Sequence, residues 1–226
     1  MIADVADLLS LRRMAESTRV LVDCVGPFVQ YGPPVVDAAL AAGTHYLDIT
    51  GEYPYMLDTH RRHDEALRAD VALVNGVGFD VVPTDVVAVL AATAFADLGL
   101  TARDLQRVDI AFAANGRVSR GTARSILQGT ARIHGSAAFV DGKWIEEPLG
   151  EKQWEAPLPP PVGIKTCISV PWGDVATAPR STGAPNVRVY MAVGKSVARS
   201  LPLLRPMLPL VGVAPVQKLL DAAIDY

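Results

Sequence analysis

The sequence has few cysteines and no recognisable set of metal ligands. Its 226 residues include only Cys24 and Cys167, too few for a disulfide scaffold, and this favours a reducing, cytoplasmic compartment. No HExxH motif or other metal-ligand spacing is found among the four histidines, which are His45, His60, His63 and His134. We therefore predict no metal site.

Clusters of basic residues are also missing. The 21 Lys and Arg residues are scattered among 24 Asp and Glu residues, and the formal net charge is -3. A nucleic-acid partner needs a basic face that meets its phosphates, so we predict that this chain has none. A hydrophobic content of 50% with 20% charged residues is typical of a folded chain rather than a disordered one.

No apolar run is long enough to span a bilayer, which takes about 20 residues. The longest uncharged stretch near the C-terminus, 206–217, is shorter and contains three prolines. The N-terminus lacks the basic start and apolar run of a signal peptide. The mean hydropathy of +0.24 is nevertheless high, which favours either a buried parallel sheet or a surface suited to lipid.

The first hundred residues alternate between strand-like and helix-like segments. We expect the helix that contains Pro33 to begin at its prolines, which tolerate a first helical turn, and to end at Gly43. Alternation at this spacing predicts βαβ units and a parallel sheet. The predicted strands and helices are, in chain order, 19–25, 33–42, 45–49, 55–69, 71–75 and about 83–98.

The pattern of segments after about residue 103 predicts an α+β arrangement. Asp141-Gly142 marks a hairpin within 138–145, because both residues tolerate a positive φ. Further predicted segments are strands 108–114, 165–170 and 187–193, a helix at 119–133 and a proline-rich loop at 147–162. The predicted domains are a partial Rossmann-type domain at 1–103, an α+β substrate or dimerisation domain at 104–195, and an apolar helical tail at 196–226.

Three glycine-containing turns, within 25–32, 46–52 and 75–85, follow the predicted parallel strands. The carboxyl ends of parallel strands share one edge of the sheet, where ligands bind, and glycine lets the backbone approach a ligand. Each turn alone is explained as an ordinary βα connection, whereas three in succession favour a binding site. Four carboxylates near this edge could orient a substrate or relay protons, or could cap helices: Asp48, Glu52, Asp80 and Asp85.

The dinucleotide fingerprint G-x-G-x-x-G is missing. Only Gly76-Val77-Gly78 begins like it, and Val81 stands where the third glycine is expected. The residues alone therefore give no strong cofactor motif.

Long segments nevertheless resemble the saccharopine dehydrogenase-like oxidoreductases. The run VDCVGPFVQYGPPVVDAALAAGTHYLDITGEYPYM, residues 22–56, is similar to the second half of that family's nucleotide domain, and so is GVGFDVVPTDVVAVLAA at 76–92. The resemblance continues at 120–125 and at 169–193. Within the family it is greatest to the trans-acting enoyl reductases, which act with polyketide synthases on lipid precursors.

The resemblance implies a second half of a Rossmann-type α/β sheet, and hydride transfer between NADP(H) and an acyl or lipid-type substrate. It implies that Trp172, Gly173 and Asp174 belong to the substrate domain's motif. The implied cofactor-binding residues are Val25, Gly26, Pro27, Phe28 and Gly51. The implied catalytic residues, facing a shared cleft, are Tyr46, Asp48, Glu52 and Asp80.

The resemblance also implies that the chain begins after the third strand of the family's nucleotide domain and stops before the usual C-terminus. The glycine loop and the helix that would hold the cofactor pyrophosphate then lie outside it, so we expect weak or no NADPH binding. The alternative is a non-catalytic truncated relative that dimerises through an open sheet edge, or a lipid-binding module that uses the tail. We expect a homo-oligomer with peripheral membrane contact.

Overall fold

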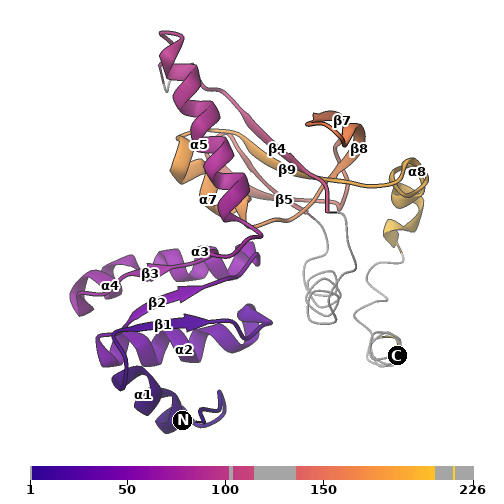
Figure 1. Ribbon diagram of the computed structural model, residues 1–226. Helices are drawn as coiled ribbons and strands as arrows, with labels where there is room; N and C mark the ends of the chain where they lie inside the picture. Colours follow the sequence, from indigo (N-terminus) through magenta and orange to yellow (C-terminus); the bar gives the residue numbers. More distant parts are fainter. Residues whose placement is uncertain (1, 102–103, 115–135, 207–215, 217–226) are drawn as a thin grey trace. The chain divides into compact units, whose positions relative to one another are not determined.

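The computed structural model describes residues 2–101, 104–114, 136–206 and 216 (Figure 1). The chain divides into two compact units, Met1–Val86 and Val87–Tyr226. Helix α5 (Val82–Asp97) contains the division between them.

The first unit is built on a three-stranded parallel sheet with the order β1-β2-β3. Its strands are β1 (Val20–Asp23), β2 (His45–Asp48) and β3 (Leu73–Val74). Leu21 lies opposite Tyr46, which lies opposite Leu73. The predicted parallel sheet and the Rossmann-type α/β class are confirmed.

Four helices accompany this sheet: α1 (Leu8–Glu16), α2 (Phe28–Ala42), α3 (Tyr53–Arg61) and α4 (His63–Ala69). The sequence analysis did not predict α1, although Asp7 caps it by accepting hydrogen bonds from the N–H groups of Leu9 and Ser10. Helix α2 ends as predicted at Gly43, whose φ of 67° is left-handed.

The prediction that Pro33 and Pro34 open α2 is wrong, because the helix begins five residues earlier at Phe28. Each proline removes an i→i−4 hydrogen bond. The carbonyl groups that lose their donors belong to Val29 and Gln30, and both residues are exposed, so water can replace the missing N–H groups.

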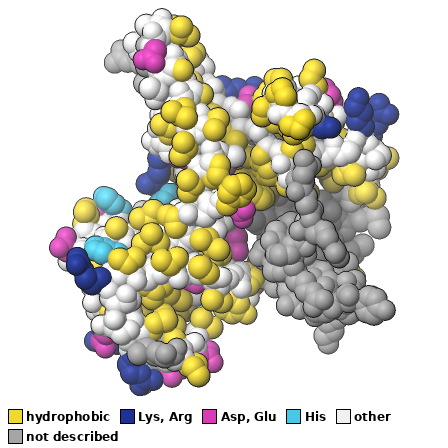
Figure 2. Space-filling view, viewed as in Figure 1, with side chains coloured by type: hydrophobic (Ala, Val, Ile, Leu, Met, Phe, Trp, Pro, Cys, Tyr) yellow, Lys and Arg dark blue, Asp and Glu magenta, His cyan; other side chains and the backbone are white. Residues whose placement is uncertain are grey.

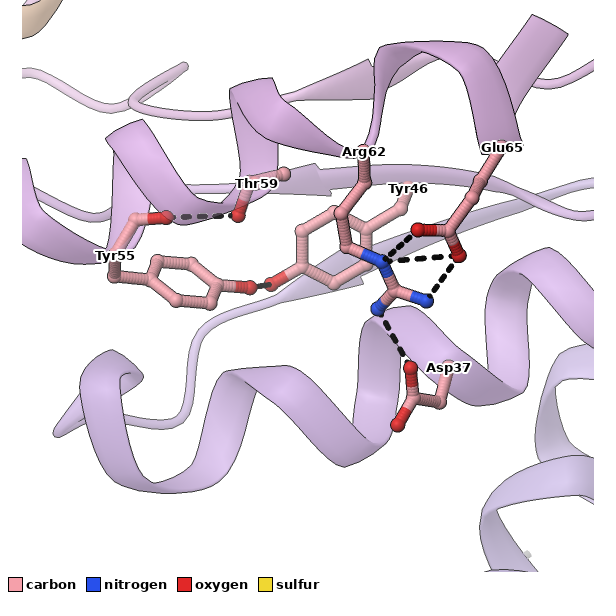
Figure 3. Close-up of polar contacts among 6 residues, drawn as sticks. All are labelled: Asp37, Tyr46, Tyr55, Thr59, Arg62 and Glu65. Carbon is pink, nitrogen blue, oxygen red and sulfur yellow. Dashed lines mark hydrogen bonds and ion pairs between the residues drawn. The ribbon is translucent and has the colours of Figure 1, made fainter.

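The predicted helix at 55–69 is in fact two helices, because Arg62 leaves helical geometry with φ -86° and ψ 14°. Its guanidinium lies between two carboxylates (Figure 3). The Arg62 Nη1 atom is 2.6 Å from Oδ1 of Asp37 in α2, and Nη2 is 2.7 Å from Oε2 of Glu65. These ion pairs join the break between α3 and α4 to α2.

One face of the three-stranded sheet carries the core of the first unit. Leu21, Tyr46 and Leu73 pack there against α1, α2 and α3, with Leu11, Ala15, Val36, Ala39 and Tyr55 among the contacting residues. The alternate strand residues Val20, Val22 and Val74 are 45%, 55% and 41% exposed. Hydrophobic side chains are accordingly visible on the surface of this unit (Figure 2).

The second unit holds a six-stranded mixed sheet with the order β6-β5-β9-β8-β7, in which β4 also pairs with β9. Its strands are β4 (Val108–Phe112), β5 (Ser136–Val140), β6 (Lys143–Glu147), β7 (Gln153–Leu158), β8 (Gly163–Ser169) and β9 (Val187–Ala192). The predicted hairpin turn at Asp141-Gly142 is confirmed by φ values of 49° and 77°. Helices α7 (Asp174–Thr182) and α8 (Lys195–Leu204) complete the α+β arrangement.

The prediction of a loop throughout 147–162 is wrong, because β7 lies within it and pairs antiparallel with β8. Pro157 is tolerated because β7 ends the sheet, and an edge strand does not need every N–H. The predicted helix at 119–133 lies outside the described residues, as does most of the tail beyond Pro206. In the described part of the chain, no helix has both the length and the apolar character needed to cross a membrane.

Candidate cofactor and substrate site

Three turns meet at the carboxyl edge of the parallel sheet, after β1, β2 and β3 (Figure 1). We call them the first turn (24–27), the second turn (49–52) and the third turn (75–81). The N–H of Val77 donates to the carbonyl of Asp48 over 2.8 Å, so the third turn lies directly beside the second. The prediction that these segments share one edge is confirmed.

Asp48 is fully buried and holds the second and third turns together. Its Oδ1 accepts hydrogen bonds from the N–H groups of Thr50 (3.1 Å) and Gly76 (2.8 Å), and its Oδ2 accepts one from the Asn75 amide (2.6 Å). Burial raises the pKa of Asp48, and the hydrogen bonds from Gly76, Thr50 and Asn75 oppose this rise. The carboxylate therefore orders backbone rather than facing solvent.

Glu52 joins the second turn to the start of α2, which directly follows the first turn. Its Oε1 accepts from the N–H of Phe28 over 3.0 Å, and its Oε2 accepts from the N–H of Val29 over 2.9 Å. These are the first two N–H groups of α2, whose own capping residue, Pro27, makes no side-chain cap. Glu52 thus supplies the cap from a different turn.

A buried chain of hydroxyl and carboxyl groups lies behind the first turn. The Tyr46 hydroxyl donates to Oδ2 of Asp23 (3.1 Å), and the Tyr46 and Tyr55 hydroxyls are 2.8 Å apart (Figure 3). The other oxygen of Asp23 accepts from the N–H of Val25 over 2.9 Å. Burial raises the pKa of Asp23 and of both tyrosines.

Asp23 was not among the predicted site residues. The available signal was the position of this carboxylate in an apolar strand: it lies two residues after Leu21 and therefore on the same buried face. The phenol ring of Tyr55 needs its own space, because a Cβ at Gly32 of α2 would overlap it. Gly32 therefore lets α2 approach α3 closely enough for Tyr55 to reach Tyr46.

The predicted catalytic residues fall into two groups. Tyr46 and Asp48 are fully buried, whereas Glu52 is half-buried and Asp80 is exposed in the third turn. Among the predicted cofactor-binding residues, Val25 and Gly26 are exposed, Pro27 and Gly51 are half-buried, and Phe28 is buried. No atom would lie within 4 Å of a Cβ at Gly51, so the space above the second turn is open. These ligand-binding and catalytic roles stay predictions.

Exposed apolar side chains surround the three turns. Val25 in the first turn is 59% exposed, and Val29 at the start of α2 is 38% exposed. Ile49 in the second turn is 41% exposed, and Phe79 in the third is 89% exposed. The third turn passes close to Ile49, because a Cβ at Gly78 would lie 2.9 Å from the Ile49 Cβ. We refer to Val25, Val29, Ile49 and Phe79 as the apolar collar. Apolar groups gathered at a ligand-binding edge fit an apolar ligand.

The motif predicted for the substrate domain lies between β8 and α7 in the second unit. Trp172 is half-buried, and its ring centroid lies 4.7 Å from that of Phe112 in β4. Gly173 and Asp174 are buried and begin α7, and Gly173 has φ -56° and ψ -32°, a helical conformation that does not require glycine. That these three residues belong to a substrate-domain motif stays a prediction.

Free cysteines and metal ligands add no further candidate. Cys24 is exposed and Cys167 is buried. In the described ranges, no three His, Cys, Asp or Glu side chains gather closely enough to hold a metal ion.

Curated proteins match part of this chain, although no family model does. A protein of Arabidopsis thaliana named as a mitochondrial saccharopine dehydrogenase-like oxidoreductase is 40% identical over 84 residues, which are 37% of this chain and 18% of that protein. The mouse saccharopine dehydrogenase-like oxidoreductase is 36% identical over 85 residues, 37% of this chain and 20% of that protein. Over the matched region, this chain is similar to the saccharopine dehydrogenase-like oxidoreductases.

The predicted resemblance to this family is therefore confirmed for the matched 37% of the chain. A Mycobacterium tuberculosis protein named as a trans-acting enoyl reductase matches equally well, with 40% identity over 84 residues, 37% of this chain and 20% of that protein. The matched region thus spans only about a fifth of the length of these relatives.

A solved structure supports the fold. Saccharopine dehydrogenase (L-Glu forming) from Saccharomyces cerevisiae has a TM-score of 0.59 and 17% identity, over 92% of this chain and 48% of that one. At this identity the similarity concerns the fold alone.

Proposed function

We propose that this chain forms the nicotinamide side of an NADP(H)-dependent oxidoreductase site that reduces an acyl or lipid-type substrate. Two observations support the proposal: relatives named as oxidoreductases, one as an enoyl reductase, and three ordered turns at the carboxyl edge of a parallel sheet. In sheets of this kind the cofactor binds beyond that edge.

The residues present fit one end of the cofactor. The first turn is fixed by Asp23 and Glu52, and the open space above Gly51 leaves room for a flat ring against the backbone. When bound, the reduced nicotinamide would supply the hydride. The chain's own residues would position that ring, and the apolar collar would exclude water from it.

The apolar collar is the observation that supports an acyl or lipid-type substrate. Phe79 at 89% exposure and Val25 at 59% leave apolar surface in water at the edge where ligands bind. An acyl chain laid across the collar would cover this surface. A charged amino-acid substrate would gain nothing from it.

Binding and turnover test the proposal separately. Because the glycine fingerprint is missing, calorimetry should show that NADPH binds the 226-residue chain more weakly than about 1 µM, which corresponds to roughly -8 kcal/mol. At saturating NADPH, the chain should oxidise the cofactor slowly when a medium-chain enoyl thioester is added. No oxidation above the rate without protein would refute the catalytic proposal and favour a non-catalytic relative.

Substitution within the collar tests the substrate class. Phe79→Ser and Val25→Ser should raise the KM for the thioester several-fold, and Leu67→Ser is the matched control, since Leu67 is 65% exposed on α4 in the same unit. Equal kinetics for Phe79→Ser and Leu67→Ser would show that the collar does not bind the acyl chain.

A second candidate function is association through the open face of the three-stranded sheet. Val20 and Val22 in β1, which ends the sheet, expose apolar surface on this face, and so does Val74 in β3. A self-associating module would show concentration-dependent sedimentation that Val22→Lys abolishes.

Cytoplasmic localisation and peripheral membrane contact also stay proposals.

A further inference from the structure

We propose that Glu52 is a positioning residue that acts as an internal anion: it closes the N-terminus of α2 to phosphate and fixes the first turn for the uncharged part of the cofactor. The second half of this statement rests on the proposed function, whereas the first half does not.

The N-terminus of a helix normally attracts anions. Its first N–H groups have no partners within the helix, and the helix dipole places about half a positive charge there. Phosphate groups of nucleotide cofactors often use such an end. Helix α2 begins at the carboxyl edge of the parallel sheet, where a cofactor would bind, so it is the natural place to expect the pyrophosphate.

In α2, however, every backbone N–H of the first turn already has an acceptor. Pro27 has no N–H, and the N–H groups of Phe28 and Val29 donate to the two carboxylate oxygens of Glu52. The next N–H, that of Gln30, donates to the Pro27 carbonyl over 3.1 Å, and that of Tyr31 donates to the same carbonyl over 3.0 Å. A phosphate would have to displace Glu52 to reach the N–H groups of Phe28 and Val29.

Glu52 is itself held firmly in place. Its N–H donates to Oγ1 of Thr50 (3.0 Å), and the N–H of Thr50 donates to the buried Asp48 carboxylate. Its carbonyl accepts from the N–H of Met56 (3.1 Å), so Glu52 also starts α3. The series Asp48, Thr50 and Glu52 therefore connects the end of β2 to the start of α2.

The net charge at this end of α2 is the sum of the Glu52 carboxylate and the partial positive charge of the helix. The carboxylate more than offsets the partial positive charge of the helix, so the α2 end repels rather than attracts a phosphate. Val25 and Val29, close to this end in the sequence, expose apolar side chains. This environment suits an uncharged ring, and it directs the cofactor phosphates away from α2.

Amide exchange tests the cap directly. We would compare the 226-residue wild type with Glu52→Gln, which keeps the shape, and Glu52→Ala, which empties the site. Glu16→Gln is the control, because Glu16 is a half-exposed carboxylate on α1 of the same unit. By NMR, the N–H groups of Phe28 and Val29 should exchange at least tenfold faster in Glu52→Ala than in Glu16→Gln, while the Thr44 N–H after α2 should exchange at an unchanged rate.

Anion dependence tests the internal charge. Thermal unfolding would be followed in chloride and in sulfate at equal ionic strength. Sulfate should raise the midpoint of Glu52→Ala more than that of wild type or Glu16→Gln, because it can replace the missing carboxylate. Equal responses in all variants, or unchanged exchange at Phe28 and Val29, would overturn the proposal. If Glu52→Ala does not fold, faster exchange at the same two groups in Glu52→Gln decides the question.

Neither measurement contains cofactor, so both can succeed even if the proposed oxidoreductase function fails. The cofactor step has its own readout, the change in NADPH dissociation constant with sulfate concentration. In wild type, sulfate should leave that constant unchanged apart from ionic strength, since its site at α2 is filled. If sulfate competes with NADPH for the wild type, and competes no more strongly for Glu52→Ala, the assigned cofactor orientation is refuted.

Discussion

The two faces of the three-stranded sheet differ in an unexpected direction. The buried face combines apolar Leu21 with polar side chains, Asp23, Tyr46 and Asp48. The partly exposed face carries mostly apolar residues, Val20 and Val22 among them. Polarity alone would assign the faces the other way round. The difference lies in the partners available to each side chain.

Buried polar groups are tolerated only when their hydrogen bonds are satisfied. Asp48 accepts three hydrogen bonds, and Asp23 accepts one from backbone and one from Tyr46. In return, these carboxylates fix the three turns that form the candidate site. The valines of the other face fix nothing of this kind, so substitutions should have very unequal effects on the two faces.

The largest effect is expected for Asp48→Ala. This change leaves the N–H groups of Thr50 and Gly76 and the Asn75 amide without their acceptor in a buried place, at a cost of about 3–5 kcal/mol in the free energy of unfolding. Denaturant unfolding followed by circular dichroism measures it. Asp58→Ala is the control, since Asp58 is 68% exposed and should matter by about 0.5 kcal/mol or less. Equal losses for the two variants would show that Asp48 does not order the turns.

A smaller effect, dependent on pH, is expected for Asp23→Asn. Burial raises the pKa of Asp23 in the folded state, so the folded protein holds this proton more tightly than the unfolded chain does. The contribution of Asp23 to the free energy of unfolding should therefore be fully present below the unfolded pKa of about 4. It should be lost as pH rises through the raised folded pKa. An asparagine cannot ionise, and its amide can still accept from Val25 and pair with the Tyr46 hydroxyl.

Unfolding free energies measured from acidic to neutral pH test this sign. The advantage of Asp23→Asn over wild type should grow as pH rises, while part of the pH dependence remains because burial also raises the pKa of Asp48. Parallel curves for the two proteins would contradict a buried, perturbed carboxylate on this face.

The alternation of strand-like and helix-like segments was enough to predict the parallel sheet, and the glycine stop at Gly43 depends only on local sequence. The start of α2 was not predictable in the same way. Pro33 looks like a first-turn residue, and what moves the start to Phe28 is Glu52, a cap 24 residues away in sequence.

The candidate site shows the same limit. Asp48 and Glu52 were correctly placed at the carboxyl edge, since strand ends define that edge. Whether their carboxylates face a ligand or the backbone depends on turn geometry that spacing does not encode. Asp23 was overlooked because nothing in the sequence shows that the Tyr46 hydroxyl lies 3.1 Å from it.

The smallest effect is expected on the open face, for Val22→Thr. This change keeps the β-branched shape and adds a hydroxyl at a side chain that is 55% exposed, so the free energy of unfolding should change by no more than about 0.5 kcal/mol. Leu21→Ala is the matched reference on the buried face, one residue earlier in β1, and should cost about 2–4 kcal/mol. Both would be measured by denaturant unfolding at several protein concentrations. A loss for Val22→Thr that approaches that of Leu21→Ala, with stability rising with concentration, would show that a second copy covers this face in solution.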